Sequence, residues 1–173
     1  MCDLKIKGYG FGGGKPHICV PIVERGAREI IREAEALIGR GTAMIEWRAD
    51  YFSDVMSLDA VFKVMEKLAA IAEHTVLLFT FRTKNQGGEI LADREYLKKL
   101  YETAAKGGAD LIDIEYFENE DADMTIRELK KSGARVIASH HDFRETPPLD
   151  EMRMRLEKMY EGGADIVKLA VMP

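Results

Sequence analysis

Residues 162–171 are GGADIVKLAV, and residues 107–115 begin with the same four letters in GGADLIDIE. In both stretches the glycines follow a polar segment with helical periodicity, and a short aliphatic run comes after Ala-Asp. A glycine in the left-handed conformation closes the last turn of many helices, and a short apolar run after such a turn is typical of a buried strand. Each stretch therefore predicts the end of a helix followed at once by a strand.

The same pattern recurs along the chain at intervals of about 30 residues. Gly41 and Gly133 also precede short apolar runs, and residues 17–23 and 75–82 have the length and composition of strands without a preceding glycine. Amphipathic segments with helical spacing separate these runs. Strands are expected to begin near residues 17, 43, 75, 110, 135 and 164, and helices are expected at 26–39, 57–73, 93–106, 122–131 and 148–161. Alternating strands and helices predict an α/β fold with a parallel sheet, either doubly wound or a (β/α)8 barrel.

Polar side chains within the strands favour the barrel. A parallel strand covered on both faces should be almost wholly apolar, but here polar residues recur at every second position and so share one face. In barrels the active site is built at the carboxyl ends of the strands, where most of these residues lie. The pairs are Glu46 with Arg48, Thr80 with Arg82, Asp113 with Glu115, and Ser139 with His141, and Lys168 lies on the last strand.

Composition is that of an ordinary globular protein and excludes several classes of partner. Hydrophobic residues make up 46% of the 173 positions, and the net charge of −5 provides no basic face for nucleic acid or membrane lipids. The N-terminus lacks the apolar core of a signal peptide, and two cysteines do not make a disulfide scaffold, so a cytoplasmic location is expected. Cys2 and Cys19 lack metal-ligand spacing, and Cys19, in an apolar run, is predicted to be a core residue. Glycine-rich residues 1–15 predict an arm or hairpin, and residues 16–173 one domain.

Lys168 is the first candidate for chemistry. Within IVKLAV its side chain is expected to be buried, which disfavours the ammonium form and lowers the pKa of the amine. A neutral amine in an apolar pocket is what Schiff-base chemistry requires. The alternative is a structural ion pair between Lys168 and Asp113 or Glu115.

His141 is the second candidate. His140 and His141 point to opposite faces of their strand, and alternation places His141 on the polar face with Ser139. A histidine that faces carboxylates can transfer protons near neutral pH. The alternatives are a core histidine or a metal ligand, but no second histidine or cysteine stands at ligand spacing.

Arg48 and Arg82 are candidates for substrate binding, because a guanidinium presents a fixed fork of hydrogen-bond donors. They could equally neutralise Glu46, Asp113 and Glu115 in a structural layer. No phosphate-binding motif accompanies them: the loop at 86–89, QGGE, lacks the spacing and lysine of a P-loop. Taken together, the residues indicate imine chemistry on a small polar carbonyl compound.

At these residues the chain resembles the type I 3-dehydroquinate dehydratases of the shikimate pathway. Five blocks occur in register from about residue 16 onward, which makes the resemblance much more specific than any single block. The similar stretches are IEWRAD at 45–50, LFTFRT at 78–83 with GGE at 87–89, IDIE at 112–115, SHHDF at 139–143 with Thr146-Pro147, and KLAVMP at 168–173.

The resemblance implies a role for each candidate. Lys168 would form an imine with the C3 ketone of 3-dehydroquinate, and His141 would remove a C2 proton and then protonate the departing C1 hydroxyl. Glu46, Arg48 and Arg82 would bind the substrate's hydroxyls. The product would be 3-dehydroshikimate, formed by syn elimination without a metal or organic cofactor.

The chain departs from the family pattern in three respects. Gln86 stands where the pattern has a glutamate that supports the histidine, and an amide supplies no charge to an imidazolium. Pro21 replaces a serine that faces the substrate in some members. The chain ends at Pro173, just after the sixth strand, whereas a complete barrel needs roughly 250 residues. By the resemblance, the absent part would carry an arginine, a serine and a glutamine for the substrate carboxylate.

The sequence leaves three functional hypotheses. The first is the dehydratase, expected to act on a small molecule as a homodimer. The second is a catalytically silent truncated barrel, or half of a split enzyme, that persists as an oligomer because its open sheet has two unpaired edges. The third is a barrel like the class I aldolases that acts on another carbonyl compound.

Overall fold

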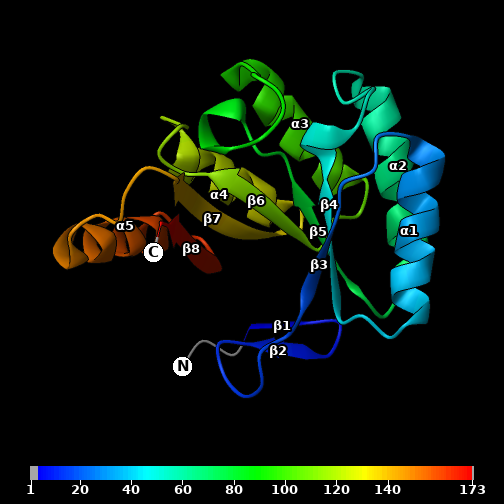
Figure 1. Cartoon of the computed structure of the whole chain (residues 1–173), viewed down its shortest axis with the longest axis horizontal. Coiled ribbons are helices and arrows are strands. Elements are labelled where there is room, and N and C mark those ends of the chain that lie inside the picture. Colours follow the sequence, from blue (N-terminus) through cyan, green and yellow to red (C-terminus); the bar gives the residue numbers. More distant parts are fainter. Residues whose placement is uncertain (1–3, 173) are drawn as a thin grey trace.

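The computed structural model describes residues 4–172, so the expectations that involve Cys2 and Pro173 lie outside the described residues. Six parallel strands form one curled sheet whose order follows the sequence (Figure 1). A doubly wound sheet would reverse its strand order at a switch point, and no reversal occurs here. The predicted barrel class is confirmed in the form of a curled half-barrel with six of eight strands. The strands are β3 (Cys19–Ile22), β4 (Met44–Arg48), β5 (Val76–Thr80), β6 (Leu111–Glu115), β7 (Arg135–Asp142) and β8 (Ile166–Val171).

Five α-helices connect these strands and lie outside the curled sheet (Figure 1). Each helix agrees with its predicted range to within two residues at either end. Two short 3-10 helices, η1 and η2, follow β4 and β5. The helices are α1 (Ala27–Gly39), α2 (Leu58–Ile71), α3 (Arg94–Lys106), α4 (Ala122–Lys131), α5 (Leu149–Glu161), η1 (Ala49–Tyr51) and η2 (Lys84–Gln86).

Local signals account for several of these boundaries. Helices α2 and α3 begin after Ser57 and Asp93. In each case the capping side chain accepts a hydrogen bond from the backbone N–H of the residue three positions later. Such caps satisfy backbone N–H groups that have no partner within the helix. In the two GGAD turns, Gly108 and Gly163 both have φ of +95°, a conformation that costs glycine little. The repeated sequence therefore makes the same helix-to-strand turn twice.

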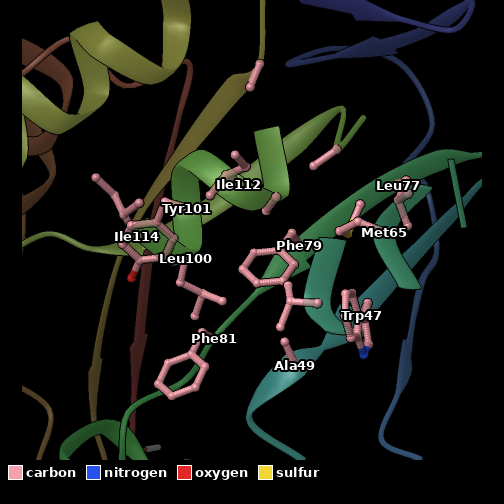
Figure 2. Packing of buried hydrophobic residues seen from close by; sticks show 14 of the residues in the cluster. Trp47, Ala49, Met65, Leu77, Phe79, Phe81, Leu100, Tyr101, Ile112 and Ile114 are labelled. Carbon is pink, nitrogen blue, oxygen red and sulfur yellow. The ribbon is translucent and has the colours of Figure 1, made fainter. Parts of the chain in front are cut away.

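The main hydrophobic core fills the space between the sheet and the helices (Figure 2). Alternate strand residues point outward into it, among them Trp47 and Phe79, whose rings meet edge to face with centroids 5.5 Å apart. Met65 of α2 and Leu100 of α3 cover them from the helical side and are fully buried. The opposite, concave face of each strand is thereby left for the polar residues.

A hairpin closes the N-terminal end of the half-barrel. Strands β1 (Leu4–Ile6) and β2 (Tyr9–Phe11) pair antiparallel, and Ile6 packs with the first inward-facing residues of the parallel strands in a second apolar cluster. Lys7 in the turn forms an ion pair of 2.6 Å with Asp110 and donates to the carbonyl of Ala72 at 2.7 Å. The division into an arm at 1–15 and a domain at 16–173 stays a prediction.

Candidate active site

The predicted polar residues do share the concave face of the half-barrel. Parallel register aligns Arg48 of β4 with Thr80 of β5 and Thr80 with Asp113 of β6. Two residues further toward the carboxyl end of β6, Glu115 is aligned with Ser139 of β7, which is aligned in turn with Lys168 of β8. Because the carboxyl ends of parallel strands meet at one end of a barrel, side chains from five strands come together there.

Arg82, just after β5, is the centre of a buried ion-pair layer. Its Nη1 donates to Glu115 Oε1 at 3.1 Å and to Ser139 Oγ at 3.0 Å, while its Nη2 lies 2.9 Å from Asp113 Oδ1. Burial disfavours the charged guanidinium, but the charges and hydrogen bonds of Asp113 and Glu115 more than offset this and raise the pKa of Arg82. Arg82 is only 4% exposed. The structure thus matches the alternative in which Arg82 neutralises carboxylates, and substrate binding by Arg82 stays a prediction.

Glu115 is held from the other side as well. Thr83 donates to it twice, from its backbone N to Oε1 at 2.8 Å and from its hydroxyl to Oε2 at 2.6 Å. Burial still raises the pKa of Glu115 above its ordinary value, against the lowering effect of Thr83 and Arg82. Thr83 was not among the predicted site residues, although it directly follows Arg82 in LFTFRT.

Lys168 lies on the concave face, but its predicted burial is wrong. Its side chain is 42% exposed, and all six residues of β8 are partly exposed. The physical reason is that β8 pairs with β7 and has no second neighbouring strand among residues 4–172. The Nζ atom lies 3.7 Å from Asp113 Oδ2, so the alternative of an ion pair with Asp113 matches the geometry. The role of nucleophile stays a prediction.

His141 shares the polar face of β7 with Ser139, as predicted, and Gln86 fixes its orientation. The backbone N–H of His141 donates to Gln86 Oε1 at 2.9 Å, and ring Nδ1 lies 3.0 Å from the same oxygen. A backbone N–H can only donate, so the amide atom that it meets must be the oxygen. Nδ1 therefore carries the proton in its bond to Gln86, and in the neutral ring Nε2 is left as the basic nitrogen.

The surroundings keep the ring of His141 neutral. Burial, followed by the positive charges of Arg82 and Lys168, lowers the pKa of His141 to about 3, against the opposing charge of Asp113. Gln86 is 2% exposed and adds no negative charge. Strand register places His141 opposite Ala170, two residues beyond the Ser139–Lys168 pair. Since alternate residues share a face, His141 and Lys168 face the same space from adjacent strands.

Arg48 and Glu46 occupy the β4 side of the concave face. Arg48 donates from Nε and Nη2 to the two carboxylate oxygens of Asp50, both at 2.8 Å, and lies over the ring of Tyr51. Burial opposes the charge of Arg48, but the hydrogen bonds and charge of Asp50 raise its pKa overall. Glu46 accepts a hydrogen bond of 2.7 Å from Thr80. Arg48 is thus held by Asp50, and not by the three carboxylates considered from the sequence.

Two residues of this region were not identified as site residues from the sequence. Asp50 is 1% exposed and also accepts from the backbone N–H of Arg82 at 3.3 Å, so it joins the ends of β4 and β5. Phe143 stacks on His141 with a centroid distance of 6.0 Å. Asp50 follows Arg48 by two residues, and Phe143 follows His141 by two residues, a spacing that could have suggested each pair.

Two smaller expectations concern β3. Cys19 is exposed, so its predicted place in the core is wrong: it lies on the open concave face, where its register partner is Met44. Pro21 pairs with Glu46 on the same face. Proline lacks the N–H that an inner strand needs, and it is tolerated here because β3 is an edge strand of the described sheet.

Residues 4–172 contain no cluster of three His, Cys, Asp or Glu side chains arranged to hold a metal ion. The expectation that no metal or cofactor takes part stays a prediction. Within the same residues, no helix combines the length and the apolar character that crossing a membrane requires.

Comparison with known proteins gives the family. The family model described as "Type I 3-dehydroquinase" matches residues 18–173. The curated 3-dehydroquinate dehydratase of Listeria innocua is 41% identical over 176 aligned positions, which cover 100% of this chain and 69% of the relative. The solved 3-dehydroquinate dehydratase of Enterococcus faecalis superimposes with a TM-score of 0.93 at 39% identity, over 98% of this chain and 72% of that one.

A second solved structure is a type I 3-dehydroquinate dehydratase from Clostridium difficile with covalently modified comenic acid. It has a TM-score of 0.94 and 40% identity, over 98% of this chain and 68% of that one. The matched family, the relatives and the fold agree with one another along nearly the whole chain. The chain therefore belongs to the type I 3-dehydroquinase family of enzymes, whose members are lyases.

Proposed function

We propose that this chain dehydrates 3-dehydroquinate to 3-dehydroshikimate through a Schiff base at Lys168. The observation that carries the proposal is the shared face of Lys168 and His141 on adjacent strands, with Gln86 holding the histidine so that Nε2 is free. Two further facts support it. The relatives are 3-dehydroquinate dehydratases, and one of them holds a covalently modified ligand.

The steps follow from the chemistry of the two groups. The amine of Lys168 adds to the C3 ketone, and loss of water gives an iminium that withdraws electrons from C2. His141 Nε2 accepts a C2 proton, and the C–H electron pair moves toward the iminium to give an enamine. The enamine then expels the C1 hydroxyl, which takes the proton from His141 and leaves as water. Hydrolysis of the new iminium consumes one water and frees Lys168, so the net change is the loss of one water.

We assign the binding roles to the β4 side of the concave face. Arg48 uses Nε and Nη2 for Asp50, which leaves Nη1 for a substrate hydroxyl, and Glu46 can accept from another hydroxyl. Gln86 supports His141 by fixing its tautomer. Because the amide carries no charge, protonation of His141 during the reaction is less stabilised than it would be beside a carboxylate.

The proposal is tested by trapping the imine. Incubation with 3-dehydroquinate and borohydride should add the reduced ligand's mass to the peptide that contains Lys168. Lys168→Ala should abolish the adduct, whereas Lys130→Ala should not, because Lys130 pairs with Asp165 at the other end of the sheet. Absence of an adduct in the unchanged protein, or its persistence in Lys168→Ala, would exclude this mechanism.

We further propose that the protein is a homodimer in the cytoplasm. Exposed apolar side chains on one face of α5 support an interface, since Leu149 and Tyr160, three helical turns apart, are 59% and 70% exposed. Sedimentation equilibrium should give twice the chain mass, and Tyr160→Glu should shift the protein toward the monomer. A monomer at all concentrations would contradict the dimer, and cell fractionation tests the location.

A further inference from the structure

Asp113 has two carboxylate oxygens in very different situations. The side chain is 1% exposed. Oδ1 accepts a hydrogen bond of 2.5 Å from Ser139 Oγ and lies 2.9 Å from Arg82 Nη2. Oδ2 is equally buried and has no hydrogen-bond partner. Asp113 therefore contacts Ser139 and Arg82 through Oδ1 alone, and Oδ2 is available for another group.

The free oxygen faces the proposed nucleophile. Lys168 Nζ lies 3.7 Å from Asp113 Oδ2, too long for a hydrogen bond but within ion-pair range. Buried acceptors almost always have a partner, and an exception calls for an explanation. A purely structural carboxylate would be expected to use both oxygens, as Glu115 does with Thr83 and Arg82.

We propose that Asp113 is the counter-ion of the protonated Schiff base at Lys168. This inference rests on the proposed function, because the iminium exists only if Lys168 forms the imine. The iminium nitrogen is Nζ itself, so its positive charge develops beside Oδ2. A fixed negative charge at that point keeps the iminium protonated while electrons move toward it from C2. A neutral imine would withdraw those electrons much less.

The neighbouring charges leave this role to Asp113. Arg82 of the β5 end and His141 of β7 also face Lys168, as does Cys19 of β3 across the concave side, but none of them is a carboxylate. Glu46 of β4 is a carboxylate on the same concave side, but the ion pair that Lys168 forms among residues 4–172 is with Asp113. Arg82 divides its charge between Asp113 and Glu115. Glu115 is engaged by Thr83 through both oxygens, so Asp113 presents the one unengaged carboxylate oxygen recorded within ion-pair distance of Nζ among residues 4–172.

The test is the pH dependence of imine trapping in Asp113→Asn, which retains the shape and removes the charge. Removal of an opposite charge at this distance should move the alkaline limb of the borohydride-trapping profile to lower pH by about 1 unit or more. The turnover number kcat should fall roughly 10-fold or more with KM little changed. Asp113→Glu, which keeps the charge, should leave the alkaline limb near its original pH.

Asp165→Asn is the matched control. Asp165, just before β8, is also an ion-paired carboxylate, but its carboxylate contacts Lys130 at 3.0 Å and the backbone N–H of Val136 and forms no ion pair with Lys168 among residues 4–172, so the loss of its charge should not move the profile. An adduct that forms in Asp113→Asn with an unshifted alkaline limb overturns the counter-ion and leaves the proposed function standing. Absence of an adduct in the unchanged protein overturns both.

A measurement on the unchanged protein covers the case in which Asp113→Asn fails to fold. The C=N vibration of the ligand complex shifts in heavy water only if the nitrogen is protonated. With a counter-ion in place the shift should persist at about pH 9. A C=N band that does not shift under those conditions overturns the proposal without any variant.

Discussion

Strands β6 and β8 follow the same four residues, Gly-Gly-Ala-Asp, yet they lie in different surroundings. All five residues of β6 are buried, whereas all six of β8 are partly exposed. β6 pairs with β5 and β7, and β8 pairs with β7 on one side in the described sheet. The repeated sequence thus specifies the turn and the strand, while burial depends on neighbours from elsewhere in the chain.

The largest difference in unfolding free energy between the two regions should appear when a buried ion pair loses its arginine. Arg82→Met would remove the buried guanidinium that pairs with both Asp113 and Glu115 of β6, which should lower the free energy of unfolding by about 3–5 kcal/mol. Arg135→Met removes a half-exposed arginine 3.9 Å from Asp165, beside β8, and should cost less than about 1 kcal/mol. Urea unfolding of both variants checks this, and similar losses would show that the two regions do not differ as described.

The next largest difference in unfolding free energy should come from replacing one isoleucine by alanine in each strand. Ile112→Ala on β6 empties a fully buried site in the main core and should cost about 2–5 kcal/mol. Ile166→Ala on β8 removes the same atoms from a partly exposed site and should cost roughly half as much. The comparison fails if Ile166→Ala is the more destabilising in urea unfolding.

These differences explain what sequence could predict. Helix and strand positions follow from periodicity and from the turn glycines, which act locally, so the range 93–106 was predicted for a helix observed at Arg94–Lys106. The shared face of Asp113, Ser139 and Lys168 follows from alternation and parallel register.

Burial and pairing of the site residues did not follow, because they depend on which strands meet and on side-chain geometry. Local apolarity predicted a buried Lys168, but burial of β8 needs a strand on its open side. The engagement of Arg82 with three partners depends on distances across β5, β6 and β7. No local pattern distinguishes the two oxygens of Asp113.

A smaller effect should separate the two turns themselves. Gly108 and Gly163 have the same φ, so Ala at either position should cost about 1 kcal/mol in backbone strain. A Cβ at Gly108 would lie 2.8 Å from the Cβ of Ala69, whereas at Gly163 the nearest contact is an ordinary 3.8 Å to Ile126. Gly108→Ala should therefore be the more destabilising by about 1 kcal/mol or more in thermal unfolding. Equal costs would mean that α2 moves aside without penalty.

The last effect on stability concerns His141 on β7, the strand between β6 and β8. In the unfolded chain a histidine gains its proton near pH 6.5, whereas in the folded protein burial and the charges of Arg82 and Lys168 lower the pKa of His141 to about 3. Between these values the unfolded state binds the extra proton, so the contribution to stability is complete above about pH 6.5 and is lost as the pH falls. The free energy of unfolding should accordingly decline from neutral pH toward pH 4.

Two variants compare how the pKa of His141 responds to a charge change at buried Gln86 and at Lys168 on the exposed strand β8. Gln86→Glu places a negative charge beside Nδ1 and should raise the pKa of His141 substantially, as followed by NMR of the imidazole. Lys168→Met removes a cation on β8 and should raise the pKa by less, because burial is the largest cause and Lys168 the third. His141→Asn identifies the resonance. If Lys168→Met produced the larger rise, the charge on the exposed strand β8 would act on His141 more strongly than a carboxylate placed beside Nδ1, and the contrast between the two sides would have to be reversed at this residue.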